Sequence, residues 1–123
     1  MTIMDAINRI DLLKPNGYAQ VEKIKWLSTL DERIMNDIIL THEDAAVTDF
    51  HGYDENTATN KELIAPAPYD TMYLYWLEAQ VDYWNGEYGK YNNSMAMFYT
   101  AYKEYNNHYN RTHMPKGKKF KFF

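Results

Sequence analysis

Cysteine is absent from this chain of 123 residues, which excludes disulfide bonds, thiolate zinc sites and cysteine nucleophiles. Glycine and proline are scarce, at five and four residues, which argues against a fibrous or disordered chain. No apolar run approaches the roughly 20 residues that span a bilayer, and the opening MTIMDAINRID lacks the apolar segment of a secretory signal. These absences predict a cytoplasmic chain with one domain and a modest core.

The hydrophobic residues that are present are mostly of the amphipathic or flexible kinds. The chain has twelve Tyr, seven Met and three Trp, and it has few Val. This composition suits helices and amphipathic contact surfaces better than a β-sheet. Tyr in particular is favoured where one end of the side chain is dry and the other is wet, as at the rim of an interface.

The net charge of −4 hides a strong asymmetry along the chain. The last ten residues, MPKGKKFKFF, carry four Lys and no acid, so the first 113 residues hold nine basic and seventeen acidic groups. We expect this body to repel DNA, whereas the tail should attract an acidic surface.

Hydrophobic periodicity predicts four helices. The expected helices cover about residues 3–13, 19–41, 69–86 and 93–111. Thr2 is a suitable N-cap for the first helix, because Asp5 then occupies a position where an acid complements the helix dipole.

The last two predicted helices are separated by Asn85-Gly86 and Gly89, each Gly weakening a helix by roughly 1 kcal/mol relative to Ala. Either the chain turns back here and forms an antiparallel pair, or one kinked helix passes through. We favour the turn because Asn92-Asn93-Ser94 resembles a fresh N-cap.

Residues 43–68 lack helical periodicity and are rich in acids and turn formers. Within them, Val47 to Phe50 is either a short strand or an extended loop. The predicted fold is therefore all-α. It is a small bundle of three to four helices over residues 1–113, with a long acidic loop and an extended basic, aromatic C-terminal arm over 114–123.

A regular apolar stripe with alternating steps of three and four residues starts at Tyr88, before the proposed cap, and continues through the last predicted helix. Its members are Tyr88, Tyr91, Met95, Phe98, Tyr102, Tyr105 and Tyr109. The stripe is either an ordinary intramolecular core or part of a subunit interface. If several Tyr residues of the stripe are buried together, their hydroxyls need hydrogen-bond partners, since an unpaired buried hydroxyl costs about 1–3 kcal/mol.

No catalytic or cofactor motif is present, so we predict no cofactor, no metal and no enzymatic activity. His42 and His51 belong to what we interpret as a solvated acidic loop; a small enzyme with a metal bound near them is the remaining alternative. His108 and His113 are expected to be exposed on different helix faces. Glu78 and Asp82 share a face at i,i+4 and are expected to lie on the wet side.

The tail alternates Lys and Phe from Lys119 to Phe122, which is the period of a strand. It would dock onto a protein partner, contact nucleic acid with Lys on phosphate and Phe on bases, or have no role. The residues expected at a subunit or partner interface are Tyr88, Tyr91, Phe98, Tyr102, Tyr105, Tyr109, Lys116, Lys118, Lys119, Phe120, Lys121, Phe122 and Phe123.

The opening MTIMDAINRIDLLKPN and residues 62–115, above all APYD followed by YLYWLEAQ and by NGEYGKYNNS, carry a family resemblance. They resemble the small head–tail connector (adaptor or neck) proteins encoded with the structural genes of tailed phages and prophages of Gram-positive bacteria.

The resemblance implies an all-α virion protein without catalytic residues, located in the phage neck and assembled in the host cytoplasm. It implies a ring, typically of twelve subunits, which docks beneath the portal, meets tail or neck proteins and continues the channel for DNA, with no membrane involved. The acidic loop would then line that channel. The alternative function is a small nucleic-acid-binding or regulatory protein that uses the basic C-terminal tail.

Overall fold

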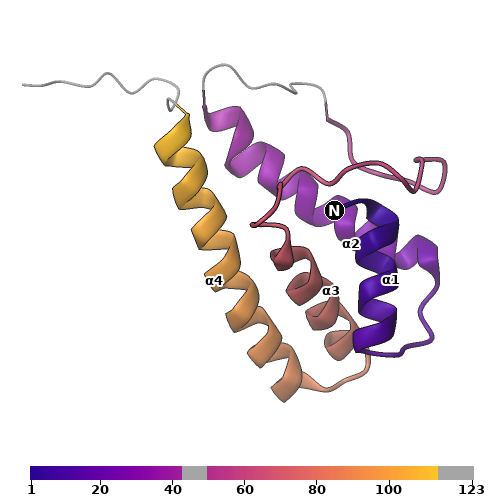
Figure 1. Cartoon of the computed structure of the whole chain (residues 1–123). Helices are drawn as coiled ribbons and strands as arrows, with labels where there is room; N and C mark the ends of the chain where they lie inside the picture. The colour runs from indigo at the N-terminus through magenta and orange to yellow at the C-terminus, as the bar shows by residue number, and fades with distance from the viewer. Residues whose placement is uncertain (43–49, 114–123) are drawn as a thin grey trace, which may run out of the picture.

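The computed structural model describes residues 1–42 and 50–113, whose path is drawn in Figure 1. In these two ranges the chain forms four α-helices and one short 3-10 turn. They are α1 (Ile3–Leu13), α2 (Gln20–Asp37), the turn η1 (Ile39–Thr41), α3 (Thr71–Trp84) and α4 (Tyr88–Thr112).

The described part contains no β-strand, and an isolated β-bridge joins Thr2 to Glu62. The prediction of a small all-α bundle is confirmed for these residues. The predicted arm over 114–123 and the loop residues 43–49, including most of the segment considered as a strand, lie outside the described residues.

Helix α3 is central, because it packs against each of the other three helices. Figure 1 shows α3 and α4 as an antiparallel hairpin, with α1 on the opposite side of α3. The C-terminal end of α1 and the α3–α4 turn lie at the lower end of the molecule, whereas the C-terminal ends of α2 and α4 lie at the upper end.

The start of α1 follows the sequence prediction closely. The Thr2 hydroxyl accepts a hydrogen bond from the Asp5 backbone N–H, and the Asp5 carboxylate accepts one from the Thr2 N–H, both at 3.0 Å. Two N–H groups that the helix leaves without partners are thereby satisfied. These hydrogen bonds hold the pKa of Asp5 below its usual value.

The turn between α3 and α4 confirms the hairpin but corrects where the last helix begins. Gly86 has φ of 77°, a conformation that favours glycine, and Glu87 is the N-cap of α4. The helix therefore starts at Tyr88 and not near Asn93, where the sequence Asn92-Asn93-Ser94 suggested a cap. The apolar stripe also begins at Tyr88, so the stripe was the better indicator of the boundary.

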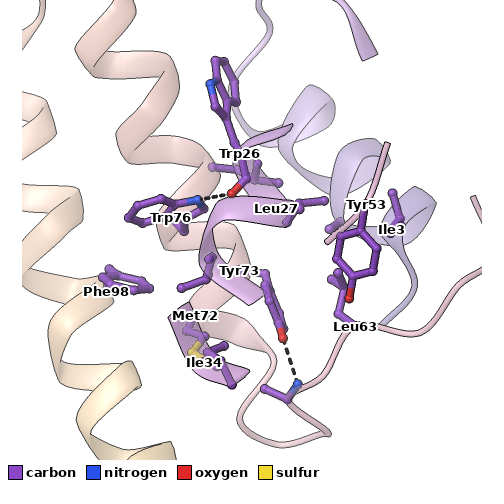
Figure 2. Packing of buried hydrophobic residues seen from close by; sticks show 14 of the residues in the cluster. Ile3, Trp26, Leu27, Ile34, Tyr53, Leu63, Met72, Tyr73, Trp76 and Phe98 are labelled. Carbon is purple, nitrogen blue, oxygen red and sulfur yellow. Dashed lines mark hydrogen bonds between the residues drawn. The ribbon is translucent and has the colours of Figure 1, made fainter. Parts of the chain in front are cut away.

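The core lies between α1, α2 and α3, and α4 closes one side of it. Figure 2 shows Phe98 of α4 beside Trp76 of α3, with ring centroids 5.1 Å apart. The Trp76 indole N–H donates to the Trp26 carbonyl oxygen of α2 at 2.8 Å, drawn as a dashed line in Figure 2. Trp76 thus links α3 to both α2 and α4, and its indole N–H is paired.

The irregular segment from Phe50 to Asp70 is fastened to the bundle and is not a freely solvated loop. Its backbone bonds to the start of α1, where the Ile3 N–H donates to the Lys61 carbonyl at 3.0 Å. Tyr53 and Leu63 are buried. Gly52 has φ of 87°, and a Cβ at this position would collide with the Ser28 and Glu32 side chains of α2.

Truncating Phe98 tests the role of α4 in this core. Phe98 is fully buried, so we expect Phe98→Ala to lower the free energy of unfolding by about 3–5 kcal/mol through lost burial and a residual cavity. Chemical denaturation measures this loss. The matched control is Tyr99→Ala, whose side chain is 57% exposed and whose truncation should cost less than about 1 kcal/mol. Equal losses in both variants would contradict this packing.

Candidate interaction surfaces and buried polar sites

Most of the α4 stripe is used inside the molecule. Phe98, Tyr105 and Tyr109 are buried, whereas Tyr91 and Tyr102 are half-buried and pack at the edge of the core. Only Tyr88, with 61% exposure, points largely to solvent. The reading of the stripe as an ordinary intramolecular core therefore holds for its central residues.

The tyrosine hydroxyls do not demand a partner subunit. No buried side-chain nitrogen or oxygen in the described ranges lacks a hydrogen-bond partner. Tyr105 and Tyr109 instead line a surface groove, while the hydroxyls of Tyr53 and Tyr73 bond to a buried carboxylate. The sequence argument that unpaired hydroxyls require a second copy is thus not supported by this part of the chain.

The tail residues predicted for an interface lie outside the described residues. They are Lys116, Lys118, Lys119, Phe120, Lys121, Phe122 and Phe123. Their role stays a prediction, as does a subunit interface at Tyr88, Tyr91, Phe98, Tyr102, Tyr105 or Tyr109.

Exposed aromatic rings gather at the α3–α4 turn. Tyr83 is 45% exposed and Trp84 is 60% exposed, at the end of α3. The Tyr83 ring lies 5.3 Å from Trp84, 5.9 Å from Tyr88 and 5.3 Å from Tyr91 between centroids. We call these four residues the end cluster. The sequence analysis named Tyr88 and Tyr91 as interface residues but did not identify Tyr83 or Trp84.

A groove of about 400 Å³ opens at the opposite end of the bundle, between α2, α4 and the Phe50–Asp70 segment. Its lining is mostly apolar, with two histidine side chains, one basic side chain and one acidic side chain. The lining residues are Met35, Ile39, Phe50, Tyr53, Lys61, Glu62, Ile64, Pro66, Tyr105, His108, Tyr109 and His113. His108 and His113 therefore line one groove, although the sequence placed them on different faces.

His42 was expected in a solvated loop, but it is buried at 2% exposure. One ring nitrogen, Nδ1, lies 2.6 Å from the Ile38 carbonyl oxygen, and the other, Nε2, lies 2.7 Å from the Asn110 Oδ1 of α4. The ring also packs edge-on against Tyr109 at 4.7 Å. His42 thus ties the end of α2 to the end of α4 as a structural residue.

No group of three or more metal-binding side chains occurs in the described ranges. His51, the other half of the imagined metal site, is exposed, whereas His42 already has partners on both nitrogens. The described residues therefore do not assemble the metal site considered from the sequence.

Asp31 is a buried carboxylate that the sequence analysis missed. It is inaccessible to solvent and accepts hydrogen bonds from the Tyr53 hydroxyl at 2.5 Å and the Tyr73 hydroxyl at 2.6 Å. The Ile64 N–H also donates to it at 3.2 Å. Tyr73 in turn accepts from the Ala65 N–H at 2.8 Å, as Figure 2 shows.

The Asp31 site joins α2, α3 and the irregular segment into one unit. Burial raises the pKa of Asp31 to about 6, although the three hydrogen bonds oppose the shift. Burial and the nearby carboxylate likewise raise the pKa of Tyr53 and Tyr73, so both remain hydroxyl donors. Because all its partners belong to the chain itself, the site is structural and not open to substrate. A signal existed in the sequence, since Asp31 continues the apolar spacing of Leu27 and Ile34.

Asp82 was expected on the wet side of its helix, but its exposure is only 1%. The Lys14 ammonium forms an ion pair with it and lies 3.7 Å from Glu78 as well. The Ser94 hydroxyl donates to the other Asp82 oxygen at 3.1 Å. This clamp joins the end of α1 to the α3–α4 hairpin beside the end cluster, so its ion pair lies within one chain and not between subunits.

Comparison with protein-family models, with curated proteins and with solved structures finds no match for this chain. In the described ranges, no helix has the length and apolar character that crossing a membrane requires.

The Asp31 site predicts a pH dependence of stability. A folded pKa near 6 against about 3.8 unfolded means that the folded state binds the proton more tightly, so stability from this group falls as pH rises from 4 to 6. Two pKa units correspond to about 3 kcal/mol. We expect Asp31→Asn to gain about this much relative to the unsubstituted chain between pH 4 and pH 7, measured by urea unfolding at each pH.

The control for this measurement is Asp37→Asn, an exposed carboxylate on the same helix. Because Asp37 is exposed, its substitution should change the free energy of unfolding by less than about 1 kcal/mol. A constant difference between Asp31→Asn and the unsubstituted chain from pH 4 to pH 7 would contradict the burial argument.

The clamp predicts a large cost for removing Lys14. Lys14→Met leaves the Asp82 carboxylate buried without its cation, so the free energy of unfolding should fall by about 3 kcal/mol. Thermal or urea unfolding measures the loss. Lys25→Met is the matched control, because Lys25 is 66% exposed and lies 3.9 Å from Glu22, a pair that should contribute less than about 1 kcal/mol. A Lys14→Met chain as stable as this control would show that the clamp contributes little.

Proposed function

We propose that this protein is a head–tail adaptor of a tailed phage, a virion structural protein that forms a ring beneath the portal and continues the DNA channel. The observation that carries the proposal is the end cluster: after the core is complete, the chain still presents several large rings to solvent at one end. Contiguous exposed aromatic surface of this kind marks a site of protein association.

Three further observations support an assembly protein. The described chain is a compact all-α bundle whose buried carboxylates, Asp31 and Asp82, are held by its own side chains. The body before residue 114 is strongly acidic, which suits a surface along which DNA passes without binding. The basic, aromatic residues 114–123 suit attachment to a partner. The resemblance of residues 62–115 to adaptor proteins of phages of Gram-positive bacteria adds the specific role.

Electron microscopy tests this proposal directly. The purified protein is imaged alone and mixed with a phage portal protein. We expect rings with a central hole that bind the portal. The resemblance implies about twelve subunits in each ring. A protein that remains monomeric and does not bind the portal would overturn the adaptor role. Salt-dependent DNA binding by such monomers, lost on Lys119 and Lys121 substitution, would favour the alternative nucleic-acid-binding function.

Deleting residues 114–123 separates folding from attachment. The deletion removes no residue of the described bundle, so the far-ultraviolet circular dichroism spectrum and the melting temperature should stay close to those of the full chain. Binding of the shortened protein to portal rings should be lost in a co-sedimentation assay. Portal binding equal to that of the full chain would show that the arm is dispensable.

A further inference from the structure

We propose that the end cluster of one copy binds the Lys- and Phe-rich residues 119–123 of a second copy. This inference rests on the proposed function in one respect: it identifies the contact that would join neighbours in the ring. It names a surface, Tyr83, Trp84, Tyr88 and Tyr91, that is distinct from the groove at the other end of the bundle.

The end cluster has the properties of a docking surface. Its three most exposed rings belong to Tyr83, Trp84 and Tyr88, at 45%, 60% and 61%. With about 200 Å² for each aromatic side chain, they leave on the order of 300 Å² of aromatic surface in water. Leu12 and Leu13, at 80% and 62% exposure, end α1 at the same lower end of the molecule in Figure 1. This patch has the size of the largest apolar patch on a typical monomer, which is often functional.

The cluster is rigidly placed, although it is exposed. Asp82, one residue before Tyr83, is held by Lys14 and Ser94. The Tyr18 hydroxyl of the α1–α2 connection donates to Asn85 Oδ1 at 2.7 Å, one residue after Trp84. A chain segment anchored in this way loses less conformational freedom when a partner binds, so burial of its rings converts more fully into affinity.

Chain length favours an occupant from another copy. The end cluster lies at the start of α4, and residue 113 lies at the far end of this helix of 25 residues, which is about 37 Å long. Phe120 follows His113 by seven residues and Phe122 by nine, so they reach at most about 25 and 32 Å from it. Phe120 therefore falls short of the end cluster of its own chain, and Phe122 and Phe123 would approach its near edge at Tyr91 only with the arm fully extended, whereas the arm of a second copy has no such restriction.

The chemistry of the two surfaces is complementary. The segment Lys119-Phe120-Lys121-Phe122 alternates cations and rings, and the end cluster offers the faces of tyrosine and tryptophan. Lysine over such a face and phenylalanine against its edge are both favourable contacts. The body before residue 114 carries an excess of acids, whereas the tail carries four Lys and no acid, so the tail is attracted to the body of another copy.

A contact between the C-terminal end of one copy and the opposite end of the next is heterologous. Such a contact, repeated around a rotation that closes, produces a ring, whereas two identical patches would produce a dimer. The end-to-end placement of arm and cluster is therefore the arrangement that a ring of identical subunits requires.

The absence of cysteine allows a crosslinking test with single-cysteine variants of the full chain. Asn92→Cys is exposed beside Tyr91 and keeps all four rings, and Phe123→Cys keeps Phe120, Phe122 and every Lys of the arm. When the two variants are mixed under mild oxidation, a disulfide between them can join only different copies. We expect the mixed pair to crosslink about tenfold faster than a pair without specific contact, because docking raises the effective concentration.

The control pair is Phe123→Cys with Thr100→Cys, an exposed position in the middle of α4. Adding Trp84→Glu to the Asn92→Cys chain should return its crosslinking to the control rate. Equal rates for the test and control pairs would overturn the proposal. So would a concentration-independent disulfide in a single chain carrying His108→Cys and Phe123→Cys, because it would place the arm in the groove of its own molecule.

Tryptophan fluorescence gives a second readout on the unlabelled chain. Trp26 and Trp76 are buried at 9% and 7% exposure, so iodide quenching reports mainly on Trp84. Quenching should fall as protein concentration rises, and it should stay high at all concentrations in a full chain with Phe120→Ala and Phe122→Ala. Quenching that does not depend on concentration in either chain would contradict docking by a second copy.

The two proposals fail in different ways. Rings that form without the Asn92–Phe123 crosslink would leave the adaptor role standing and remove the proposed contact. Crosslinked chains that never bind a portal would keep the contact and remove the adaptor role.

Discussion

The packing of α4 against α3 is the constraint on which the rest of this molecule depends. One side of α4 carries seven large apolar residues, and the central ones, such as Phe98 beside Trp76, complete the core. Since α4 has 25 residues and α3 only 14, the longer helix extends past its partner, and its end contributes to the groove opposite the hairpin turn. The hairpin thus produces both surfaces of the protein, the aromatic end cluster at its turn and the groove at its open end.

Periodicity predicted the helices well because burial of a regular stripe is a local signal that tertiary contacts reinforce. It failed where polar residues have partners far away in the sequence. Asn92-Asn93-Ser94 looked like a helix start because such residues often cap, yet Ser94 lies inside α4 and donates to the buried Asp82. In the same way, α2 ends at Asp37, and the residues expected to continue it form the 3-10 turn that leads into the buried His42.

The buried polar sites were the least predictable part of the structure. Asp31, Asp82 and His42 each have at least one partner more than twenty residues away in the sequence, namely Tyr53, Lys14 and Asn110. An isolated charge on a helix is usually solvated, so its type and spacing do not reveal a distant partner. Half of the end cluster could be predicted from the sequence. The stripe predicted its tyrosines on α4, but only the fold brings Tyr83 and Trp84 beside them.

In these features the buried charged groups stabilise one chain, and the exposed aromatic end is the surface that we propose for association. Sedimentation velocity over a wide concentration range tests this central claim most directly, since each chain has a mass of 14.6 kDa. The account predicts a species many times this mass that dissociates when Trp84 is replaced by Glu. A 14.6 kDa monomer at every concentration, with or without that substitution, would contradict it.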